Sequence, residues 1–148
     1  IKTKPNSSRV IVSSWNPNAH CVDGKSALPP CHTLFQFFVE NGKLSCQLYQ
    51  RSADMPIGQP INVISYSLLT HLIAQQCDLQ VGEFVWTGGD CHIYHNQLSM
   101  VKEIISRKTH EFPTMSVNKA KNIESYEWSD ITINNYVSES KIAIPVAR

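Results

Sequence analysis

Two strand-like segments joined by Asn41-Gly42 constrain the fold of this chain more than any other feature. His32 to Glu40 is rich in aromatic and β-branched residues, and Lys43 to Ser52 alternates apolar with polar side chains. Asn-Gly favours the two-residue type I′ turn because both of its positions accept a positive φ. The sequence therefore predicts a long β-hairpin that sets Cys31 opposite Ser52 and His32 opposite Arg51.

The open end of this hairpin gathers reactive side chains. Cys31 meets the cation of Arg51, the hydroxyl of Ser52 and the carboxylate of Asp54. Strict alternation puts Arg51 on the face opposite Cys31, so a shared site predicts a β-bulge. A cation beside Cys31 would favour the thiolate, which is the form that a nucleophilic cysteine needs. From the residues alone, Cys31 can equally be a plain strand residue.

Other patterns predict one domain of mixed α/β (α+β) type with a mainly antiparallel or mixed sheet. A largely buried helix is expected from Ile61 to Cys77, after a turn that contains Pro56, Gly58 and Pro60. An amphipathic helix is expected from Asn96 to Arg107. The expected strands are residues 9–15, 84–87, 91–94, 114–117 and 128–133, with a turn at Gly88-Gly89-Asp90.

Composition excludes several classes of protein. The 148 residues carry a formal net charge of +1, so no strong overall field marks a binder of nucleic acid or membrane surfaces. No apolar run is long enough to span a bilayer. The five cysteines are odd in number and form no CxxC pair, which favours a reducing cytoplasm and predicts no metal site, the Cys91-His92 cluster included. The first residue is Ile1 rather than Met, which is consistent with a processed terminus or a piece of a longer chain.

Several long segments resemble one known family. They are Leu28-Pro29-Pro30-Cys31-His32, Gln50-Arg51-Ser52-Ala53-Asp54, residues 62–76 and the run from Phe84 to Tyr94. Together they resemble the signature segments of thymidylate synthases, over almost the whole chain but only for the C-terminal part of that family's polypeptide. The resemblance implies a mixed sheet with bulged strands, surrounded by helices, with one sheet face used for dimerisation.

The resemblance also implies a reaction and a set of site residues. Thymidylate synthases methylate dUMP to dTMP with 5,10-methylenetetrahydrofolate, and by resemblance Cys31 adds to C6 of uracil. Arg51, Asp54 and Asn62 complete the implied catalytic set, with Asn62 recognising the uracil edge. Nucleotide contacts are implied for Gln50, Arg51, Ser52, Ala53, Asp54, Asn62, His92, Ile93 and Tyr94, and folate contacts for Leu28, Asp54, Gly58 and Ala147.

Some family features differ or are missing. Arg9 is implied to reach the partner subunit's phosphate in a homodimer, but the family's arginine pair is Ser8-Arg9 here. The N-terminal portion of the family is absent from these residues. We therefore expect an N-terminal segment or a second chain to complete the subunit, and we expect this chain alone to be unable to run the full reaction.

Two other functions are kept open. One is a dUMP hydroxymethylase on the same fold, which adds water where the synthase transfers hydride. The other is a catalytically inactive homologue that binds nucleotide, RNA or a protein partner. The altered Ser8-Arg9 pair and the terminal Arg148 favour the inactive homologue, and the complete Cys31 set argues against it.

Overall fold

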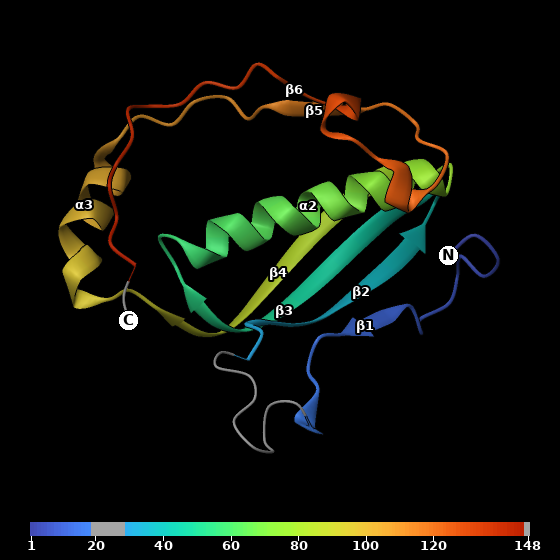
Figure 1. Ribbon diagram of the computed structural model, residues 1–148, viewed down its shortest axis with the longest axis horizontal. Coiled ribbons are helices and arrows are strands. Elements are labelled where there is room, and N and C mark those ends of the chain that lie inside the picture. Colours follow the sequence, from blue (N-terminus) through green and yellow to red (C-terminus); the bar gives the residue numbers. More distant parts are fainter. Residues whose placement is uncertain (19–28, 147–148) are drawn as a thin grey trace.

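The computed structural model describes residues 1–18 and 29–146 of the chain. Its main sheet has the strand order β1-β2-β3-β4 (Figure 1). The strands are β1 (Ile11–Ser13), β2 (His32–Glu40), β3 (Lys43–Asp54) and β4 (Gln80–His92). β1, β2 and β3 pair antiparallel, whereas β3 and β4 pair parallel, which confirms the prediction of a mixed sheet.

The predicted hairpin is confirmed. Asn41 has a φ of 50° and Gly42 a φ of 74°, the positive values that a type I′ turn requires. From this turn β2 and β3 stay in register, from Glu40↔Lys43 to Leu34↔Tyr49. The first strand is shorter than predicted, although backbone hydrogen bonds to β2 extend from the carbonyl of Val10 to the amide of Ser14.

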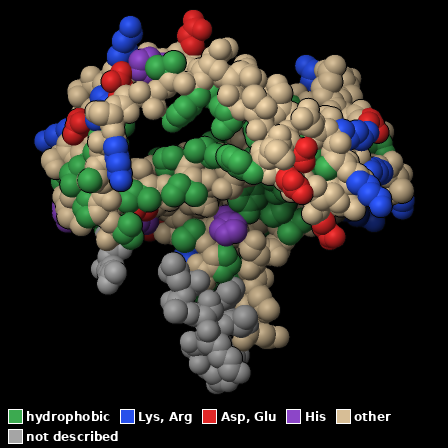
Figure 2. Space-filling model, turned by 45° about the horizontal axis from the view of Figure 1, so that its top comes forward, with side chains coloured by type: hydrophobic (Ala, Val, Ile, Leu, Met, Phe, Trp, Pro, Cys, Tyr) green, Lys and Arg blue, Asp and Glu red, His purple; other side chains and the backbone are tan. Residues whose placement is uncertain are grey.

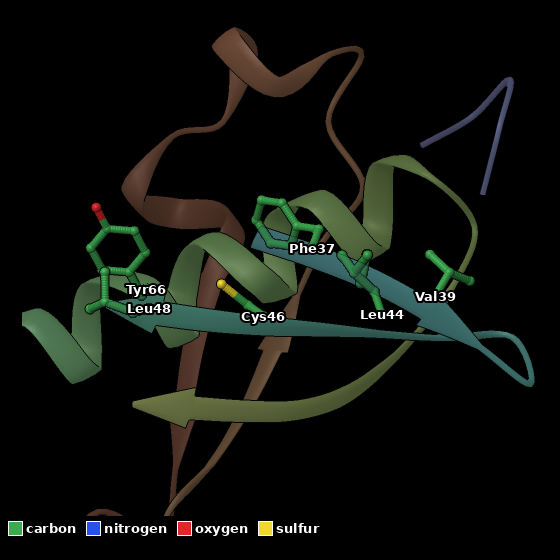
Figure 3. Packing of buried hydrophobic residues seen from close by; sticks show 7 residues of the cluster. Phe37, Val39, Leu44, Cys46, Leu48 and Tyr66 are labelled. Carbon is green, nitrogen blue, oxygen red and sulfur yellow. The ribbon is translucent and has the colours of Figure 1, made fainter. Parts of the chain in front are cut away.

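The core lies between β3 and the long helix α2 (Gly58–Gln76). Leu44, Cys46 and Leu48 alternate along β3 and are almost completely buried against the helix (Figure 3). Phe37 from β2 and Tyr66 from α2 complete the cluster. Each buried leucine contributes about 1.5–3 kcal/mol relative to an exposed one, so this face fixes the hairpin against α2.

α2 begins three residues earlier than predicted. Pro60 lies in its first turn rather than in a preceding loop. Proline is tolerated there because its missing N–H would have no partner inside the helix in any case. The helix ends in a Schellman motif, in which Asp78 has a φ of 55° and the amide of Leu79 donates to the carbonyl of Ala74 at 3.0 Å.

The prediction that α2 is largely buried is wrong for its outer face. Ile61 is 59% exposed and Ile64 67% exposed, while Tyr66, Thr70 and Ala74 are buried against the sheet. The outer face borders an apolar groove instead of a packed layer, in the part of the chain that the structure describes. α2 thus carries apolar side chains on all sides, and the sheet covers only one of these sides.

The turn predicted at Gly88-Gly89-Asp90 is also wrong. These residues belong to β4, which is continuous across the two segments predicted as separate strands. Neither glycine has a positive φ. A Cβ on Gly89 would lie 2.8 Å from the carbonyl oxygen of Arg51, so glycine serves close packing between strands here rather than a turn.

The C-terminal third forms an arch over α2 (Figure 1). It contains the 3-10 turn η1 (His95–Gln97), α3 (Leu98–Ser106), β5 (Thr114–Val117), the 3-10 turns η2 (Ile123–Ser125) and η3 (Trp128–Asp130), and β6 (Ile131–Asn134). β5 confirms the predicted strand, whereas the segment predicted from Trp128 is helical for its first three residues. β5 and β6 pair antiparallel as a separate small sheet.

Within residues 1–18 and 29–146, no helix is both long and apolar enough to cross a membrane. In the same residues, no group of three His, Cys, Asp or Glu side chains is placed to hold a metal ion.

Candidate active site

A β-bulge brings Cys31 across from Arg51. The register of β2 and β3 shifts between His32 and Leu34, so that His32 pairs with Gln50 and Thr33 is the extra residue. The amide of Arg51 then donates to the carbonyl of Cys31 at 2.9 Å. Residues directly across an antiparallel pair point to the same side, so the predicted bulge is confirmed. The predicted pairings of Cys31 with Ser52 and of His32 with Arg51 are both wrong by one residue, because the turn sets the register only up to the bulge.

The guanidinium of Arg51 holds the segment that leads into Cys31. Its Nη2 donates to the carbonyl of Pro29 at 2.8 Å and its Nε to that of Pro30 at 3.1 Å. The ring of Trp15 lies under the guanidinium, 5.5 Å from the Cζ atom to the ring centroid. Two hydrogen bonds from one planar group fix both the position and the direction of the Pro29-Pro30 segment. Arg51 thus restrains the backbone that leads into Cys31.

His32, on the other side of Cys31's strand, is anchored to α2. Its Nδ1 lies 2.6 Å from the hydroxyl of Tyr66, and the two rings meet edge to face. Burial, followed by the charge interaction with Cys46, raises the pKa of Tyr66, so its hydroxyl stays protonated at neutral pH. Burial likewise raises the pKa of the Cys46 thiol, which is therefore a core residue and not a second nucleophile.

Asn62 lies one helical turn before Tyr66. Residues four apart share a helix face, so Asn62 is on the side of α2 that carries the contact to His32. It is the fifth residue of the helix and therefore not its N-cap, which is Ile57. Gly58, the first residue of α2, lies beside Asp54, with which an added Cβ would make an ordinary contact at 3.7 Å.

Gln50 and its neighbours are held inside the protein. The side chain of Gln50 is 1% exposed, accepts a hydrogen bond from the indole of Trp86 at 2.9 Å and donates to the carbonyl of Ser52 at 3.1 Å. Ala53 is completely buried and pairs with Cys91 of β4. These residues shape the strand from which Arg51 and Asp54 project.

Asp54 is the last residue of β3, and its two carboxylate oxygens have different surroundings. Its Oδ2 accepts a hydrogen bond from Nε2 of Gln97 at 3.2 Å. Its Oδ1 is buried and has no hydrogen-bond partner among residues 1–18 and 29–146. A buried carboxylate oxygen needs a donor, so this atom is suited to an N–H or O–H group of a ligand.

His92 and Tyr94 lie together beside Asp54, although not on one strand as predicted. β4 ends at His92, which pairs with Asp54, and Tyr94 is the N-cap of η1. The two rings still meet edge to face at a centroid distance of 5.0 Å. Nδ1 of His92 is buried, makes no hydrogen bond within the described part of the chain, and lies 3.6 Å from Oδ2 of Asp90. Ile93 and Tyr94 are partly exposed at 42% and 41%, so this corner of the site is open.

Three predicted residues lie apart from this cluster or outside the described part. Arg9 is exposed and precedes β1, with its amide bonded to the hydroxyl of Ser7 at 3.2 Å. Leu28 and Ala147 lie outside the residues that the structure describes.

Comparison with known proteins identifies the family of the chain. The sequence model of the thymidylate synthase family matches residues 1–148. The chain belongs to the thymidylate synthase family. It is 50% identical over 147 residues to the thymidylate synthase of Francisella philomiragia, an alignment covering 92% of this chain and 54% of that protein. It is 52% identical over 148 residues to that of Vesicomyosocius okutanii, covering 99% of this chain and 55% of that protein. The chain therefore spans about half the length of the curated relatives it matches.

Two residues of this candidate site are not among those that the sequence predicts. Gln97 is completely buried and binds the carboxylate of Asp54, and Tyr66 binds His32. Neither carries a local signal, because one lies at the start of an amphipathic helix and the other within a helical apolar pattern. Only the contacts between distant segments distinguish them.

Proposed function

We propose that this chain is part of a thymidylate synthase that methylates dUMP to dTMP with 5,10-methylenetetrahydrofolate as the co-substrate and no metal. The observation that carries the proposal is the clamp of Arg51 on the Pro29-Pro30 segment across the bulge from Cys31. This clamp fixes the backbone that leads into Cys31 at the end of the sheet. A cysteine on a restrained backbone at the end of a sheet is suited to act as a nucleophile.

In the proposed reaction the Cys31 sulfur forms a bond to C6 of uracil, and the electron pair of the C5–C6 double bond moves to C5. C5 then bonds to the one-carbon unit of the folate. C5 next loses its proton to water, and the electron pair of that C–H bond forms a double bond from C5 to the one-carbon unit, whose bond to the folate nitrogen breaks. The folate supplies the hydride that completes the methyl group and becomes dihydrofolate. The sulfur–C6 bond breaks at the end, and the thiolate of Cys31 is regenerated.

The remaining residues serve binding in this proposal. Asn62 offers an amide that both donates and accepts, which suits O4 and N3–H of uracil. His92 and Tyr94 contact the ribose, and Arg51 contacts the phosphate with the part of its guanidinium that faces away from the prolines. Oδ1 of Asp54, which has no partner within the described ranges, is an acceptor that fits an N–H group of the nucleotide or the folate.

We propose that the outer face of α2 is covered by the part of the subunit that the relatives carry beyond the matched half. A groove of about 430 Å³ lies between α2 and the arch, and its walls are almost wholly apolar. Figure 2 shows hydrophobic side chains around the hollow beneath the arch. Ile64, Trp128 and Tyr136 in its walls are 67%, 77% and 68% exposed. The relatives are nearly twice as long as this chain, which leaves ample length for such a segment.

We propose a homodimer formed through the sheet face that points away from α2. The exposed apolar residues of that face are Ile11, Leu34, Phe38, Tyr49 and Val85. An apolar sheet face of this extent favours burial against a second copy. Arg9 precedes the strand at its edge, from where it would reach the partner subunit's nucleotide phosphate. Cys31, Cys46, Cys77 and Cys91 are free thiols, in keeping with the proposed cytoplasmic location.

Product analysis tests the proposed function. The chain, completed by the segment that its relatives carry, is incubated with dUMP and methylenetetrahydrofolate, and the nucleotides are separated by chromatography. The proposal predicts dTMP together with an equal amount of dihydrofolate. 5-Hydroxymethyl-dUMP without dihydrofolate would identify a hydroxymethylase instead, and unchanged dUMP would identify an inactive homologue.

A further inference from the structure

Gln97 joins three parts of the candidate active site through one side-chain amide. Its Nε2 donates to Oδ2 of Asp54 at 3.2 Å and to the carbonyl of Pro145 at 3.1 Å. Its Oε1 accepts a hydrogen bond from the amide of Tyr94 at 3.2 Å. The side chain is completely buried, and all of its donors and its acceptor are in use.

These three partners come from distant parts of the chain. Asp54 ends β3, Tyr94 follows β4, and Pro145 belongs to the C-terminal tail that runs down beside α3 (Figure 1). Other side chains at this position would not make the same contacts. Glutamate would lose both donors, and histidine in its neutral form has a single one.

The hydrogen bond to Asp54 selects which of its oxygens remains free. Gln97 occupies Oδ2, so the buried Oδ1 is the oxygen left for a ligand. Without Gln97, the carboxylate could rotate about its χ2 bond, which has a broad energy profile. The ligand would then meet a mixture of carboxylate orientations.

The tail depends more on Gln97 than the Tyr94 segment does. The strand before Tyr94 is also held by its ladder with β3 and by the amide of Met55, which donates to the carbonyl of His92 at 3.0 Å. By contrast, the bond to Pro145 is the one hydrogen bond that joins residues 141–146 to the site, among the residues that the structure describes. Ile144 and Val146 of this tail line one pocket together with Pro56, Ile57 and Ile61.

We infer that Gln97 is a positioning residue that couples the orientation of Asp54 to the docking of the C-terminal tail, and that it thereby controls binding of the folate more than binding of the nucleotide. This inference rests on the proposed function. The nucleotide has further contacts, from Arg51, Asn62 and His92, that do not depend on the tail. The folate is expected to lie between Asp54 and the tail, whose relative positions Gln97 sets.

The test compares two matched variants of the completed enzyme. Gln97→Met keeps the length of the side chain and removes its hydrogen-bonding groups. Gln76→Met makes the same change at a second buried glutamine, which bonds Ala120 and Tyr126 far from the site. Gln97→Glu, which retains the acceptor for the amide of Tyr94, serves as a second variant should Gln97→Met fail to fold.

Binding of the two substrates is measured separately. We expect both Gln97 variants to raise the KM for the folate about 10-fold or more, since a hydrogen bond to a charged group is lost. The dissociation constant for dUMP should change far less, and Gln76→Met should alter neither value. An equal increase in the folate KM and the dUMP dissociation constant, or an unchanged folate KM, would overturn the inference.

A double-mutant cycle shows whether Gln97 acts through Asp54. The folate KM is measured for Gln97→Met, Asp54→Asn and the double variant. Residues that act through one another are non-additive, so the double variant should be little worse than Asp54→Asn alone. Full additivity would overturn the inference. An unaltered enzyme that makes no dTMP would overturn the proposed function itself, whereas an active one with a normal Gln97→Met variant would overturn only the role of Gln97.

Discussion

The amide of Arg51 donates to the carbonyl of Cys31 at 2.9 Å, one residue out of the register that the Asn41-Gly42 turn sets. This contact and the two bonds from the Arg51 side chain to Pro29 and Pro30 converge on the backbone around one cysteine. The bulge at Thr33 allows these contacts, because the extra residue shifts Cys31 to a position across from Arg51.

Arg51→Lys should slow the reaction of Cys31 while leaving the fold intact. Lysine keeps the charge but cannot hold two carbonyls with a planar fork. In the completed enzyme, we expect the rate of adduct formation with 5-fluoro-dUMP to fall about 10-fold or more, as two charge-assisted hydrogen bonds are disturbed. Arg107→Lys is the matched control, since Arg107 bonds Glu103 and Ser140 away from Cys31. Equal rates in the two variants would contradict the clamp.

Gly89→Ala should destabilise the protein, although Gly89 is in a strand and not in a turn. Its Cβ would meet the backbone oxygen of Arg51 at 2.8 Å, and backbone cannot move aside cheaply. We expect the free energy of unfolding in urea to fall by about 1–3 kcal/mol. Gly58→Ala, where the nearest atom is 3.7 Å away, should leave it unchanged or raise it by up to about 1 kcal/mol. A larger loss for Gly58→Ala would refute this account of β4.

Phe38→Glu should convert the proposed dimer into a monomer. Phe38 is 49% exposed on the sheet face away from α2, where a second copy would bury it. A buried carboxylate without a partner is strongly unfavourable, so the sedimentation coefficient should drop to that of one subunit. Ile105→Glu on α3, at a residue 77% exposed, should leave the dimer intact. A dimer that survives Phe38→Glu would exclude this face as the interface.

The free energy of unfolding should decrease as the pH is lowered from about 6.5, and His71 should cause part of this decrease. Burial lowers the pKa of His71 in the folded protein. Below the unfolded-state value of about 6.5, the unfolded chain binds a proton that the folded chain does not, so stability decreases as pH falls. The free energy of unfolding is measured by urea titration at several pH values between about 7 and 5, and His71→Gln should make it depend less on pH. An unchanged slope in His71→Gln would show that other groups cause the loss.

The fold was predictable where one local pattern decides the outcome. Asn41-Gly42 allows one kind of turn, and the alternation of Leu44, Cys46 and Leu48 allows one buried face. The prediction failed where tertiary packing gives a residue a second use. Gly88 and Gly89 permit close strand contact as well as turns, and Pro60 fits the first turn of a helix as well as a loop.

The sequence predicts which residues form the candidate site better than it predicts the contacts between them. The segments around Cys31, Asp54 and His92 were identified from their resemblance to the family, and the bulge was predicted from the need to place Cys31 and Arg51 on one side. The partners of Asp54 and His32 could not be predicted, because Gln97 and Tyr66 carry no local pattern that distinguishes them from other helical residues.

Covalent trapping of the nucleotide tests directly whether Cys31 is the nucleophile. The completed enzyme is incubated with 5-fluoro-dUMP and methylenetetrahydrofolate, and its intact mass is measured before and after. The account predicts a mass increase equal to both ligands on this chain, lost in Cys31→Ala and retained in Cys77→Ala. A folded enzyme that gains no mass, or whose adduct survives Cys31→Ala, would contradict the assignment of Cys31 as the nucleophile.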